Sequence, residues 1–387
     1  MVGVLLCDQS AAFDLCDHAI LIEKLRLMGV GDAAALWFSS YLSGRRQSCM
    51  VDGQLSVPLE IPQCGVPQGS IGGPIMWLIF TCDQPDVVHK HPIDIKYFDR
   101  GCSVSDRQSG DNCGILVGYV DDGAYSFAHN NPVVLSTVLS ETYAKLAEWM
   151  NANKLVINAD KTHLLVMGSR KHNSQRKDIQ LVAGGHIVQP SESEKLLGCH
   201  LHQSLDWRLH LHDHEPSLLN QLIRRINGLK KICINADFQT RLTVANGVVI
   251  SKLSYLITLW GGAKQYLMNM LQVQQMTAAR LVCGFGSWRL SRRKLLNRVG
   301  WLSVKQLIFY HTVLQVHKTL GNGLPLSLYN DLYNDYARST RNAEVGNLRQ
   351  VKRCRSTFQY RAVQFYNSVP ADIRKGTVDT VKHKMKK

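Results

Sequence analysis

The chain lacks the features of several common protein classes. Its eleven cysteines form no C-x-x-C pair and no regular framework, so we expect reduced, mostly buried thiols. The most apolar stretch, "VANGVVISKLSYLITLW", is interrupted by Asn246 and Lys252 and is shorter than the roughly 20 apolar residues of a membrane span. The opening "MVGVLLCD" has no basic start and reaches an acid at Asp8, so it is not a signal peptide. We expect an intracellular protein, in the nucleus or cytoplasm, that is neither secreted nor embedded in a membrane.

Acidic residues are scarce toward the C-terminus. Residues 280–387 hold 21 Lys and Arg against 5 Asp and Glu, whereas the preceding residues are nearly balanced, so the formal charge of +15 is C-terminal. A region of this charge attracts polyanions, because binding releases their counterions. Nucleic acid is the first partner to consider, an anionic membrane surface is the second, and a solvated basic surface is the alternative without a partner.

The hydrophobic pattern predicts an α+β fold. With 387 residues and 45% apolar content, the chain can form two or three domains. "VGVLLCD" is typical of a core strand that ends at Asp8, and Leu135, Leu139, Leu146 and Trp149 fall on one helical face. Strands interleave with helices up to about residue 198, and helical periodicity dominates afterwards, as expected for an α+β domain followed by α-helical ones.

Two adjacent carboxylates, Asp121 and Asp122, stand between the strand-like runs "ILVGYV" and "AYSFA". Asp122 followed by Gly123 is by itself a strong signal for a hairpin turn. The second carboxylate is not needed for a turn, and two like charges held together repel unless a cation lies beside them. If the strands share one sheet, Asp8 joins the pair, and three carboxylates can hold two Mg²⁺ ions about 3.5–4 Å apart, as in polymerases and nucleases.

A glycine-rich loop, "GVPQGSIGGP", surrounds Gln68 and leads into an apolar helix with Pro74 in its first turn. The loop lacks the Gly-Lys-Ser/Thr ending of a phosphate-binding P-loop. One interpretation is a tight loop before a core helix. The other is a loop whose small residues let a ligand approach the backbone closely.

Five motifs together resemble those of a known family. "DQSAAFD", "GVPQGSIGGP", "YVDD", "NADKTHLLVMG" and "KLLG" are similar, in order and spacing, to the reverse transcriptases of non-LTR (LINE-type) retrotransposons of the jockey and CR1 kind. The resemblance covers nearly the whole chain, since "QQMTAARLVCGF" and "RSTFQYRAVQFYNSVPADIR" are similar to segments that follow the polymerase in those elements. It implies a polymerase palm, an antiparallel sheet with packed helices, with partial fingers over residues 1–198. A helical thumb over residues 199–265 and a basic helical C-terminal domain over residues 266–387 would follow.

The resemblance also implies roles for individual residues. Asp8 and Asp121 would be the metal ligands, with Asp122 a weaker one. Lys161, in the turn of "NADKTHLLVMG", would protonate the leaving pyrophosphate; the alternative is a solvated turn lysine. Phe13 would be the steric gate that excludes a 2′-hydroxyl, although plain core is the competing interpretation. The remaining implied contacts are to the incoming nucleotide and template base by Gln68 and Gly69, to the nascent base pair by Tyr119, and to the primer by Leu197 and Gly198.

The implied activity is that of an RNA-directed DNA polymerase. It would use template RNA, primer DNA and dNTPs with two Mg²⁺ ions, for which Mn²⁺ can substitute. Family members carry fingers before the first catalytic aspartate, whereas this chain begins seven residues before Asp8, so we expect an N-terminally truncated form with impaired activity. A catalytically silent remnant that binds nucleic acid is the alternative. A two-metal nuclease is less favoured, because Gln68, Phe13 and the thumb-like helices have no obvious role in one.

Two further clusters have competing interpretations. The C-terminal segment "RQVKRCRSTFQYRAVQFYN" interleaves basic and aromatic residues, which suits either phosphate and base contacts or an amphipathic helix with its rings turned inward. Its basic residues are Arg349, Lys352, Arg353, Arg355 and Arg361. The run "CHLHQSLDWRLHLHDH" holds His200, His202, His210, His212 and His214, but no cysteine pair or Glu-x-x-His frame accompanies them, so a zinc site is disfavoured.

Overall fold

The computed structural model describes residues 1–9, 12–85, 113–119, 122–168, 173–284, 287–325, 328–330, 332, 348 and 357–386. For Asp8, Asp122 and Cys113–Tyr119 it describes the backbone alone. The described residues divide into two compact units, which meet in the sequence between Leu197 and Gly198.

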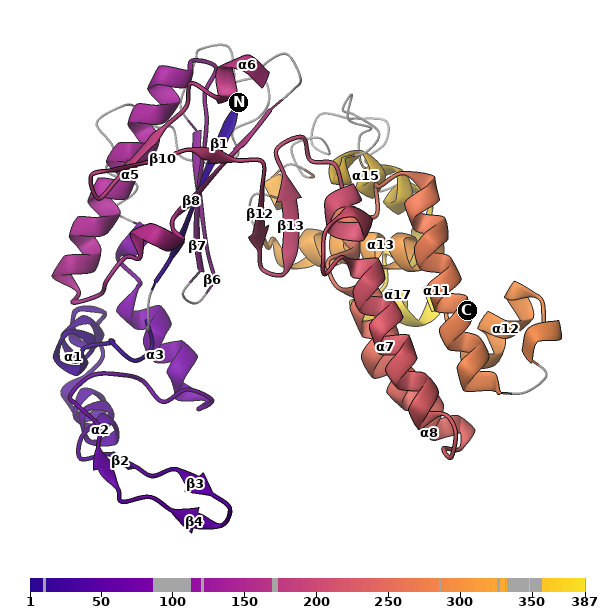
Figure 1. Ribbon diagram of the computed structural model, residues 1–387, viewed down its shortest axis with the longest axis horizontal. Coiled ribbons are helices and arrows are strands. Elements are labelled where there is room, and N and C mark those ends of the chain that lie inside the picture. The colour runs from indigo at the N-terminus through magenta and orange to yellow at the C-terminus, as the bar shows by residue number, and fades with distance from the viewer. Residues whose placement is uncertain are drawn as a thin grey trace. The chain divides into compact units, whose positions relative to one another are not determined.

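The first unit is built on a five-stranded sheet with the strand order β11-β8-β1-β7-β6 (Figure 1). Its strands are β1 (Val2–Asp8), β6 (Cys113–Tyr119), β7 (Asp122–Ala128), β8 (His163–Met167) and β11 (Pro190–Ser191). β1 pairs antiparallel with β7 on one side and with β8 on the other, β6 is antiparallel to β7, and only the short β11 runs parallel to its neighbour. The predicted antiparallel palm sheet is confirmed, and the strand that carries Asp8 is its central strand.

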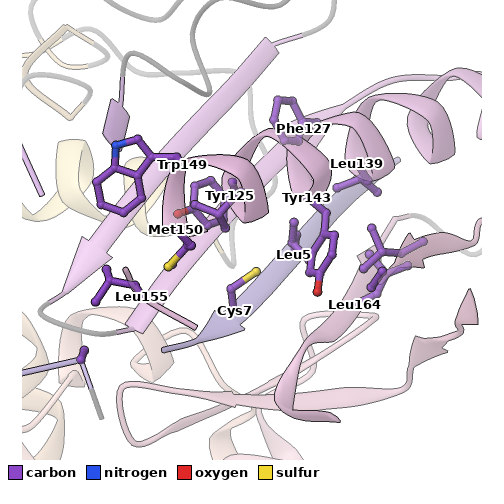
Figure 2. Close-up of a cluster of buried hydrophobic side chains, with 14 of the residues drawn as sticks. Leu5, Cys7, Tyr125, Phe127, Leu139, Tyr143, Trp149, Met150, Leu155 and Leu164 are labelled. Carbon is purple, nitrogen blue, oxygen red and sulfur yellow. The ribbon is translucent and has the colours of Figure 1, made fainter. Parts of the chain in front are cut away.

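Helix α5 (Pro132–Ala152) covers one face of this sheet (Figure 1). The helix begins where the Asn131 side chain accepts a hydrogen bond from the Val133 backbone, with Pro132 in the first turn, where its missing N–H costs nothing. The predicted apolar face is buried, and alternate residues of β1, namely Leu5 and Cys7, face the same core. Figure 2 shows this core, in which β1, β7 and β8 pack side chains against α5.

The first unit contains further helices and strands besides the five-stranded sheet and α5. Its helices are α1 (His18–Leu27), α2 (Asp32–Leu42), α3 (Gly72–Phe80) and the single turn α6 (Asn173–Arg176), with a 3-10 turn, η2 (Ala159–Lys161). Its short strands are β2 (Arg46–Gln47), β3 (Met50–Val51), β4 (Gln54–Leu55), β5 (Leu59–Glu60), β9 (Leu181–Ala183), β10 (His186–Val188) and β12 (Ser193–Leu196). Residues 45–64 contain a narrow arm of paired strands, β2 with β5 and β3 with β4, that turns at Asp52 and Gly53, both with positive φ.

The second unit is almost entirely helical, as predicted. After β13 (Cys199–His202) it contains two π-helical turns, η4 (Leu209–Asp213) and η5 (Asn246–Ile250), and a 3-10 turn, η6 (Ser287–Arg289). Its α-helices are α7 (Leu218–Ile232), α8 (Phe238–Ala245), α9 (Ser251–Ser254), α10 (Ile257–Trp260), α11 (Gln265–Cys283), α12 (Arg292–Val299), α13 (Val304–Asn322), α15 (Phe358–Ser368), α16 (Ala371–Arg374) and α17 (Val378–Lys386). The expected boundary after residue 265 falls at the first residue of α11, and the buried residues of α10 and α11 belong to one hydrophobic core.

Candidate active site

The sheet brings the ends of β1 and β7 together. Asp8, the last residue of β1, is the Cα partner of Asp122, the first residue of β7. Directly opposed residues of antiparallel strands have Cα atoms about 4.5–5.5 Å apart. The backbone therefore places Asp8 and Asp122 at one edge of the sheet, which we call the carboxylate corner. Asp121 lies outside the described residues, and of Tyr119 only the backbone is described.

β6 and β7 form the expected hairpin, but Asp122 and Gly123 are not its turn. β6 ends at Tyr119, which pairs with Asp122, so both residues of the Asp-Gly pair belong to β7. The interpretation of this pair as the turn is therefore wrong. A Cβ atom on Gly123 would lie 3.0 Å from Cε2 of Tyr125, whose ring is buried and whose hydroxyl accepts a hydrogen bond from Nε2 of Gln84 at 3.0 Å. A larger residue here would therefore require the buried Tyr125 ring to shift by a few tenths of an ångström.

A pocket of about 200 Å³ adjoins the carboxylate corner. It is lined by residues from β1, β7, η2, β8 and β12, namely Leu6, Cys7, Gly123, Lys161, His163, Glu194, Lys195 and Leu196. Cys7 and Gly123 are the direct chain neighbours of the paired aspartates. A ligand bound at the carboxylate corner would therefore extend into this pocket.

Lys161 reaches this pocket from the turn in which the sequence placed it. The Asn158 side chain accepts hydrogen bonds from the backbone N–H groups of Asp160 and Lys161, and the Thr162 hydroxyl donates to the Asn158 carbonyl at 2.9 Å. These contacts fix η2 immediately before β8. The Lys161 side chain is exposed and forms part of the pocket wall.

The pocket contains more basic than acidic side chains. Lys161 and Lys195 lie in its wall with His163, whose Nδ1 is 3.5 Å from Oε1 of Glu194. Burial raises the pKa of the Cys7 thiol to about 12, so this group stays protonated and uncharged at neutral pH. The walls therefore suit an anionic group more than a cationic one.

Phe13 lies in the segment that follows β1, and its half-buried ring stacks on Trp77 of α3 with centroids 5.3 Å apart. Trp77 is 1% exposed and packs in the core of the first unit. The backbone of the same segment bonds the glycine-rich loop, since Val66 N–H donates to the Phe13 carbonyl at 2.8 Å. Phe13 is therefore packed on its Trp77 side yet not sealed from solvent.

Gln68 lies in the exposed part of the glycine-rich loop. Its Nε2 donates a hydrogen bond to Oδ1 of Asp14 at 3.1 Å, which places Gln68 next to the Phe13 segment although 54 positions separate the bonded residues. Gly69 is exposed and has a φ of 77°, a conformation that favours glycine. The structure thus brings together three of the residues expected near the nucleotide, Phe13, Gln68 and Gly69.

Leu197 and Gly198 lie between β12 and β13. Both have positive φ, 47° and 76°, which is the backbone pattern of a two-residue type I′ turn. Leucine in this region is strained, because its Cβ crowds the backbone there. Leu197 and Gly198, which the resemblance gives as primer contacts, therefore form a tight turn in which a leucine adopts the left-handed conformation.

The basic C-terminal cluster is only partly described. Arg349, Lys352, Arg353 and Arg355 lie outside the described residues. Arg361 is 7% exposed, and its Nη2 donates a hydrogen bond to the Thr258 carbonyl at 2.9 Å. Its guanidinium therefore faces the protein interior, so we do not include Arg361 in a phosphate-binding surface.

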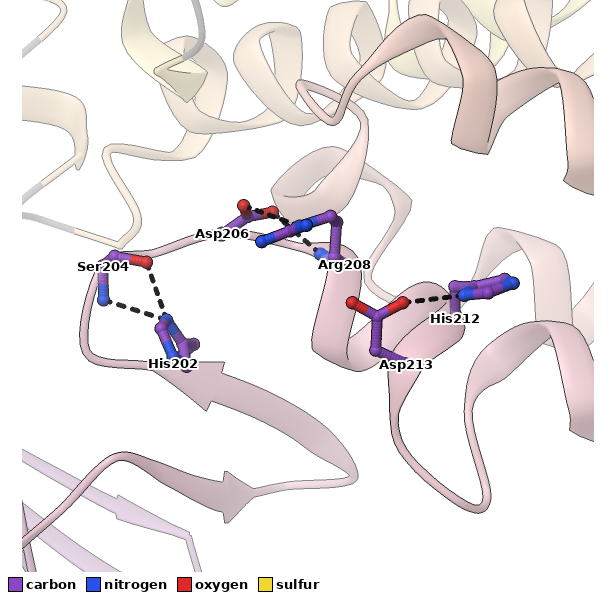
Figure 3. A network of polar contacts seen from close by, with 6 residues as sticks. All are labelled: His202, Ser204, Asp206, Arg208, His212 and Asp213. Atoms are coloured by element: carbon purple, nitrogen blue, oxygen red, sulfur yellow. Dashed lines mark hydrogen bonds and ion pairs between the residues drawn. The ribbon is translucent and has the colours of Figure 1, made fainter.

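The histidine-rich segment is held by contacts among its own residues. His202 shares a hydrogen bond with the Ser204 hydroxyl at 2.7 Å, and His212 pairs with Asp213 at 2.7 Å (Figure 3). The ring centroids of His200 and His214 lie 4.1 Å apart. Among the side chains that the structure describes, no group of three or more His, Cys, Asp and Glu is arranged to hold a metal ion.

Several residues of the site were not assigned a role from the sequence. His163, Glu194 and Lys195 belong to the pocket wall, and Asp14 and Trp77 position the two predicted nucleotide-side residues. His163, Lys195 and Asp14 lie within the motifs "NADKTHLLVMG", "KLLG" and "DQSAAFD", and Glu194 directly precedes "KLLG", so membership of a motif or nearness to one was the available signal. Trp77 had only the apolar pattern of its helix.

An antiparallel sheet with paired aspartates at one edge, a glycine-rich loop beside it and a helical unit after it define the class of polymerases with a palm domain. None of the described helices has both the length and the apolar content needed to cross a membrane.

The chain belongs to the reverse transcriptase (RNA-dependent DNA polymerase) family, whose model matches residues 2–201. It is 26% identical over 279 residues to the probable RNA-directed DNA polymerase from transposon BS of Drosophila melanogaster, covering 71% of this chain and 28% of that protein. It is 25% identical over 293 residues to the RNA-directed DNA polymerase from mobile element jockey of Drosophila funebris, covering 76% of this chain and 29% of that protein. The chain thus spans less than a third of the length of these relatives.

Among solved structures, the chain is similar to apo telomerase from Candida tropicalis, with a TM-score of 0.39 and 10% identity. That alignment covers 85% of this chain and 53% of the telomerase chain. Telomerase from Candida albicans in complex with an RNA fragment matches with a TM-score of 0.33 and 12% identity, over 89% of this chain and 48% of that one.

Proposed function

We propose that this chain is an RNA-directed DNA polymerase of a non-LTR retrotransposon, which adds dNTPs to a primer 3′-hydroxyl on an RNA template. One observation carries the proposal: Asp8 and Asp122 are Cα partners at a sheet edge that adjoins a pocket lined by Lys161. Family membership supports it, because the matched model is that of reverse transcriptases.

Reverse transcriptases generally use divalent metal ions, and the carboxylate corner fits such ions. The backbone pairs two aspartates at one sheet edge, and carboxylate oxygens are the ligands that Mg²⁺ prefers. We assign Asp8, Asp121 and Asp122 as the residues that would hold two Mg²⁺ ions, with Mn²⁺ as a substitute. When bound, the ions would supply positive charge for the attacking hydroxyl and for the leaving group.

Lys161 would act on the leaving group. Pyrophosphate departs with added negative charge, and the ammonium of Lys161, an exposed residue of the pocket wall, would donate a proton to it. Lys195 in the same wall would add charge attraction without proton transfer. The Glu194 carboxylate beside His163 would limit the excess positive charge of the pocket.

The nucleotide would bind against the Phe13 segment and the glycine-rich loop. Phe13, supported by Trp77, would lie beneath the sugar and leave no room for a 2′-hydroxyl. Gln68, held by Asp14, and the backbone at Gly69, which has a positive φ, would contact the nucleotide and the template base. Tyr119 would support the nascent base pair, and the Leu197–Gly198 turn would contact the primer.

The partners would be template RNA, primer DNA and dNTPs. In the C-terminal segment, Arg349, Lys352, Arg353 and Arg355 are proposed to contact nucleic-acid phosphates. This part of the proposal rests on charge and aromatic content alone.

Primer extension tests the proposal. The full chain would be incubated with an RNA template, a labelled DNA primer, dNTPs and Mg²⁺. Incorporation by the unaltered chain that Asp8→Asn and Asp121→Asn each abolish is the expected result. Asp160→Asn is a matched control, because Asp160 is an exposed acid outside the pocket and its removal should leave incorporation unchanged.

Two other outcomes would replace the proposal. RNA binding with no incorporation, unaffected by Asp121→Asn, would indicate a catalytically silent retroelement remnant. Nicking of labelled DNA that depends on Asp8 and Asp121, again without incorporation, would indicate a two-metal nuclease.

A further inference from the structure

One long segment of the second unit carries basic residues without any acidic ones. Between Asp237 and Asp331 the chain has eleven Lys and Arg and no Asp or Glu. This segment includes α11, against which α12 packs, and the following helix α13. A basic side chain on α12 therefore has no acidic neighbour on its own helix, on α11 or on α13.

The exposed face of α12 concentrates this charge. Leu295, Leu296 and Val299 are buried, so the helix is oriented with its other face toward solvent. The exposed cationic residues of α12 and of η6 before it are Arg289, Arg292, Arg293, Lys294 and Arg298. Within the described residues, none of these five forms an ion pair.

Helix stability does not explain these cations. Arg292, Arg293 and Lys294 occupy the first turn of α12, after the N-cap Ser291. The N-terminus of a helix carries a partial positive charge, so acidic residues stabilise the first turn and basic residues oppose it. A local preference is broken here, and such breaks are expected where residues serve a ligand.

An exposed aromatic ring lies beside the basic face. Trp288 of η6 is 72% exposed, and the Arg280 guanidinium lies 4.8 Å from its ring centroid. Because this indole is largely in solvent, packing in the protein core does not account for its position. Its flat face can instead stack on an unpaired base. Cationic side chains beside an exposed aromatic ring are the combination with which proteins bind single-stranded nucleic acid.

We propose that η6 and α12 form a binding site for single-stranded RNA, in which Arg293, Lys294 and Arg298 contact phosphates and Trp288 stacks on a base. RNA is chosen because the family to which the chain belongs copies RNA, and the proposal does not depend on catalysis by this chain. A membrane surface is less suited, because α12 turns Leu295, Leu296 and Val299 into the protein, which leaves Trp288 as the exposed large apolar side chain of this site, too little for an amphipathic helix to insert.

The phosphate contacts are tested with the full chain and a labelled, unstructured RNA of about 16 nucleotides, with affinity measured by fluorescence anisotropy over a range of salt concentrations. The triple variant Arg293→Ala, Lys294→Ala, Arg298→Ala should bind about 100-fold more weakly at about 0.1 M salt, and the slope of log Kd against log salt should fall by about 2. The matched control is Lys305→Ala, Lys318→Ala, Lys375→Ala, which removes the same charge from exposed positions on other parts of the second unit. The control should retain most of the salt dependence, and an equal loss in both variants would overturn the site.

The stacking contact is tested by Trp288→Ala, which should weaken RNA binding about tenfold and leave the salt slope unchanged. Trp37→Ala is the control, because Trp37 is another exposed indole, 61% accessible, on α2 of the first unit. Equal weakening by both substitutions, or by neither, would overturn the role of Trp288.

The ligand is identified by three competitors. Blunt RNA duplex, single-stranded DNA of the same sequence and vesicles of phosphatidylserine should each bind more weakly than the single-stranded RNA, and tighter binding of any of them would overturn the assignment. All substituted side chains of the site are exposed, so thermal melting should be unchanged. Asp8→Asn should bind RNA normally, which separates a failure of this site from a failure of the proposed polymerase activity.

Discussion

The ring of Phe13 stacks on the indole of Trp77 with an angle of 23° between their planes. Trp77 belongs to the helix that follows the glycine-rich loop, and its side chain is fixed in the core. The place of Phe13 is thus set by a buried ring 64 positions later in the sequence. If Phe13 is the sugar-selecting residue, its selectivity depends on this support.

Replacing Phe13 with valine should relax selection against the 2′-hydroxyl. The smaller side chain removes the ring that would exclude the hydroxyl, and we expect the ratio of rNTP to dNTP incorporation to rise about 10- to 100-fold. Primer extension with each nucleotide type alone measures the ratio. Phe38→Val is the control, since Phe38 is a half-buried ring of α2 packed on the same core. A shared rise in both variants would show a general loosening instead of a steric gate.

Replacing Lys161 with leucine should slow nucleotide addition by about 100-fold, because a general acid contributes at least this much to proton transfer. Single-turnover extension under saturating dNTP separates this effect from weaker nucleotide binding. Lys195→Leu removes a second cation from the same pocket wall and should raise KM more than it lowers the rate. Equal effects of the two substitutions on the rate would assign Lys161 a charge role only.

Replacing Gly123 with alanine should destabilise the first unit by about 1–3 kcal/mol, the usual cost of an added group in a packed site. The new Cβ would approach the buried Tyr125 ring at 3.0 Å, and the ring is also held by Gln84. Urea unfolding measures the change. Gly228→Ala, in open space on helix α7, should be neutral or slightly stabilising, since alanine favours the helix. Little difference between the two variants would argue against the tight packing of Tyr125 on Gly123.

The second unit should lose stability on acidification through His210. Burial, followed by the charges of His200 and Lys252, lowers the pKa of His210 to about 4 from the ordinary value of about 6.5. The unfolded chain therefore binds the extra proton first, so the contribution of His210 is complete above about pH 6.5 and is lost as the pH falls toward about 4. The loss amounts to about 2–3 kcal/mol.

Urea unfolding at a series of pH values between these limits measures this loss. His210→Phe should flatten the pH dependence, because it removes the titrating group. His212→Gln, at an exposed histidine of the same segment, should leave the dependence as it is. An unchanged slope in His210→Phe would mean that another group is responsible.

Arg361 and Arg298 should respond in opposite ways to substitution by methionine. Arg361 is buried and bonded to the Thr258 carbonyl, so Arg361→Met should lower the free energy of unfolding by about 1–3 kcal/mol and leave RNA affinity unchanged. Arg298 is exposed, so Arg298→Met should weaken RNA binding without a change in stability. Thermal melting and anisotropy on both proteins provide the comparison.

Local sequence patterns predicted those parts of the fold that local interactions determine. The buried face of α5 and the first turn of α3 follow from apolar spacing and from Pro132 and Pro74. The Asp122-Gly123 pair was misinterpreted as a turn because turn propensity is a local signal. The register of β7 is instead set by its pairing with β1, where the alternation of buried residues leaves one alignment favourable.

The candidate site was predictable only where a motif marks it. His163 and Glu194 face each other in the pocket from strands 31 positions apart in the sequence, and no short pattern connects them. At Arg361 a sequence pattern was present but did not show which side chains face solvent. Basic and aromatic residues are interleaved in this segment, and the packing of α15 buries Arg361 together with Ala362, Val363 and Tyr366.

The central strand β1 has a consequence for how the protein is made. Its partners β7 and β8 lie more than 110 residues further along the chain, and Val2 pairs with both Ala128 and Met167. During synthesis, β1 therefore leaves the ribosome long before β7 and β8, and it lacks these two partners until they have been made. Contacts of such long sequence separation form slowly. The aspartate at the end of β1 thus acquires its neighbour late, and nascent chains that stop before β7 should emerge without a formed carboxylate corner.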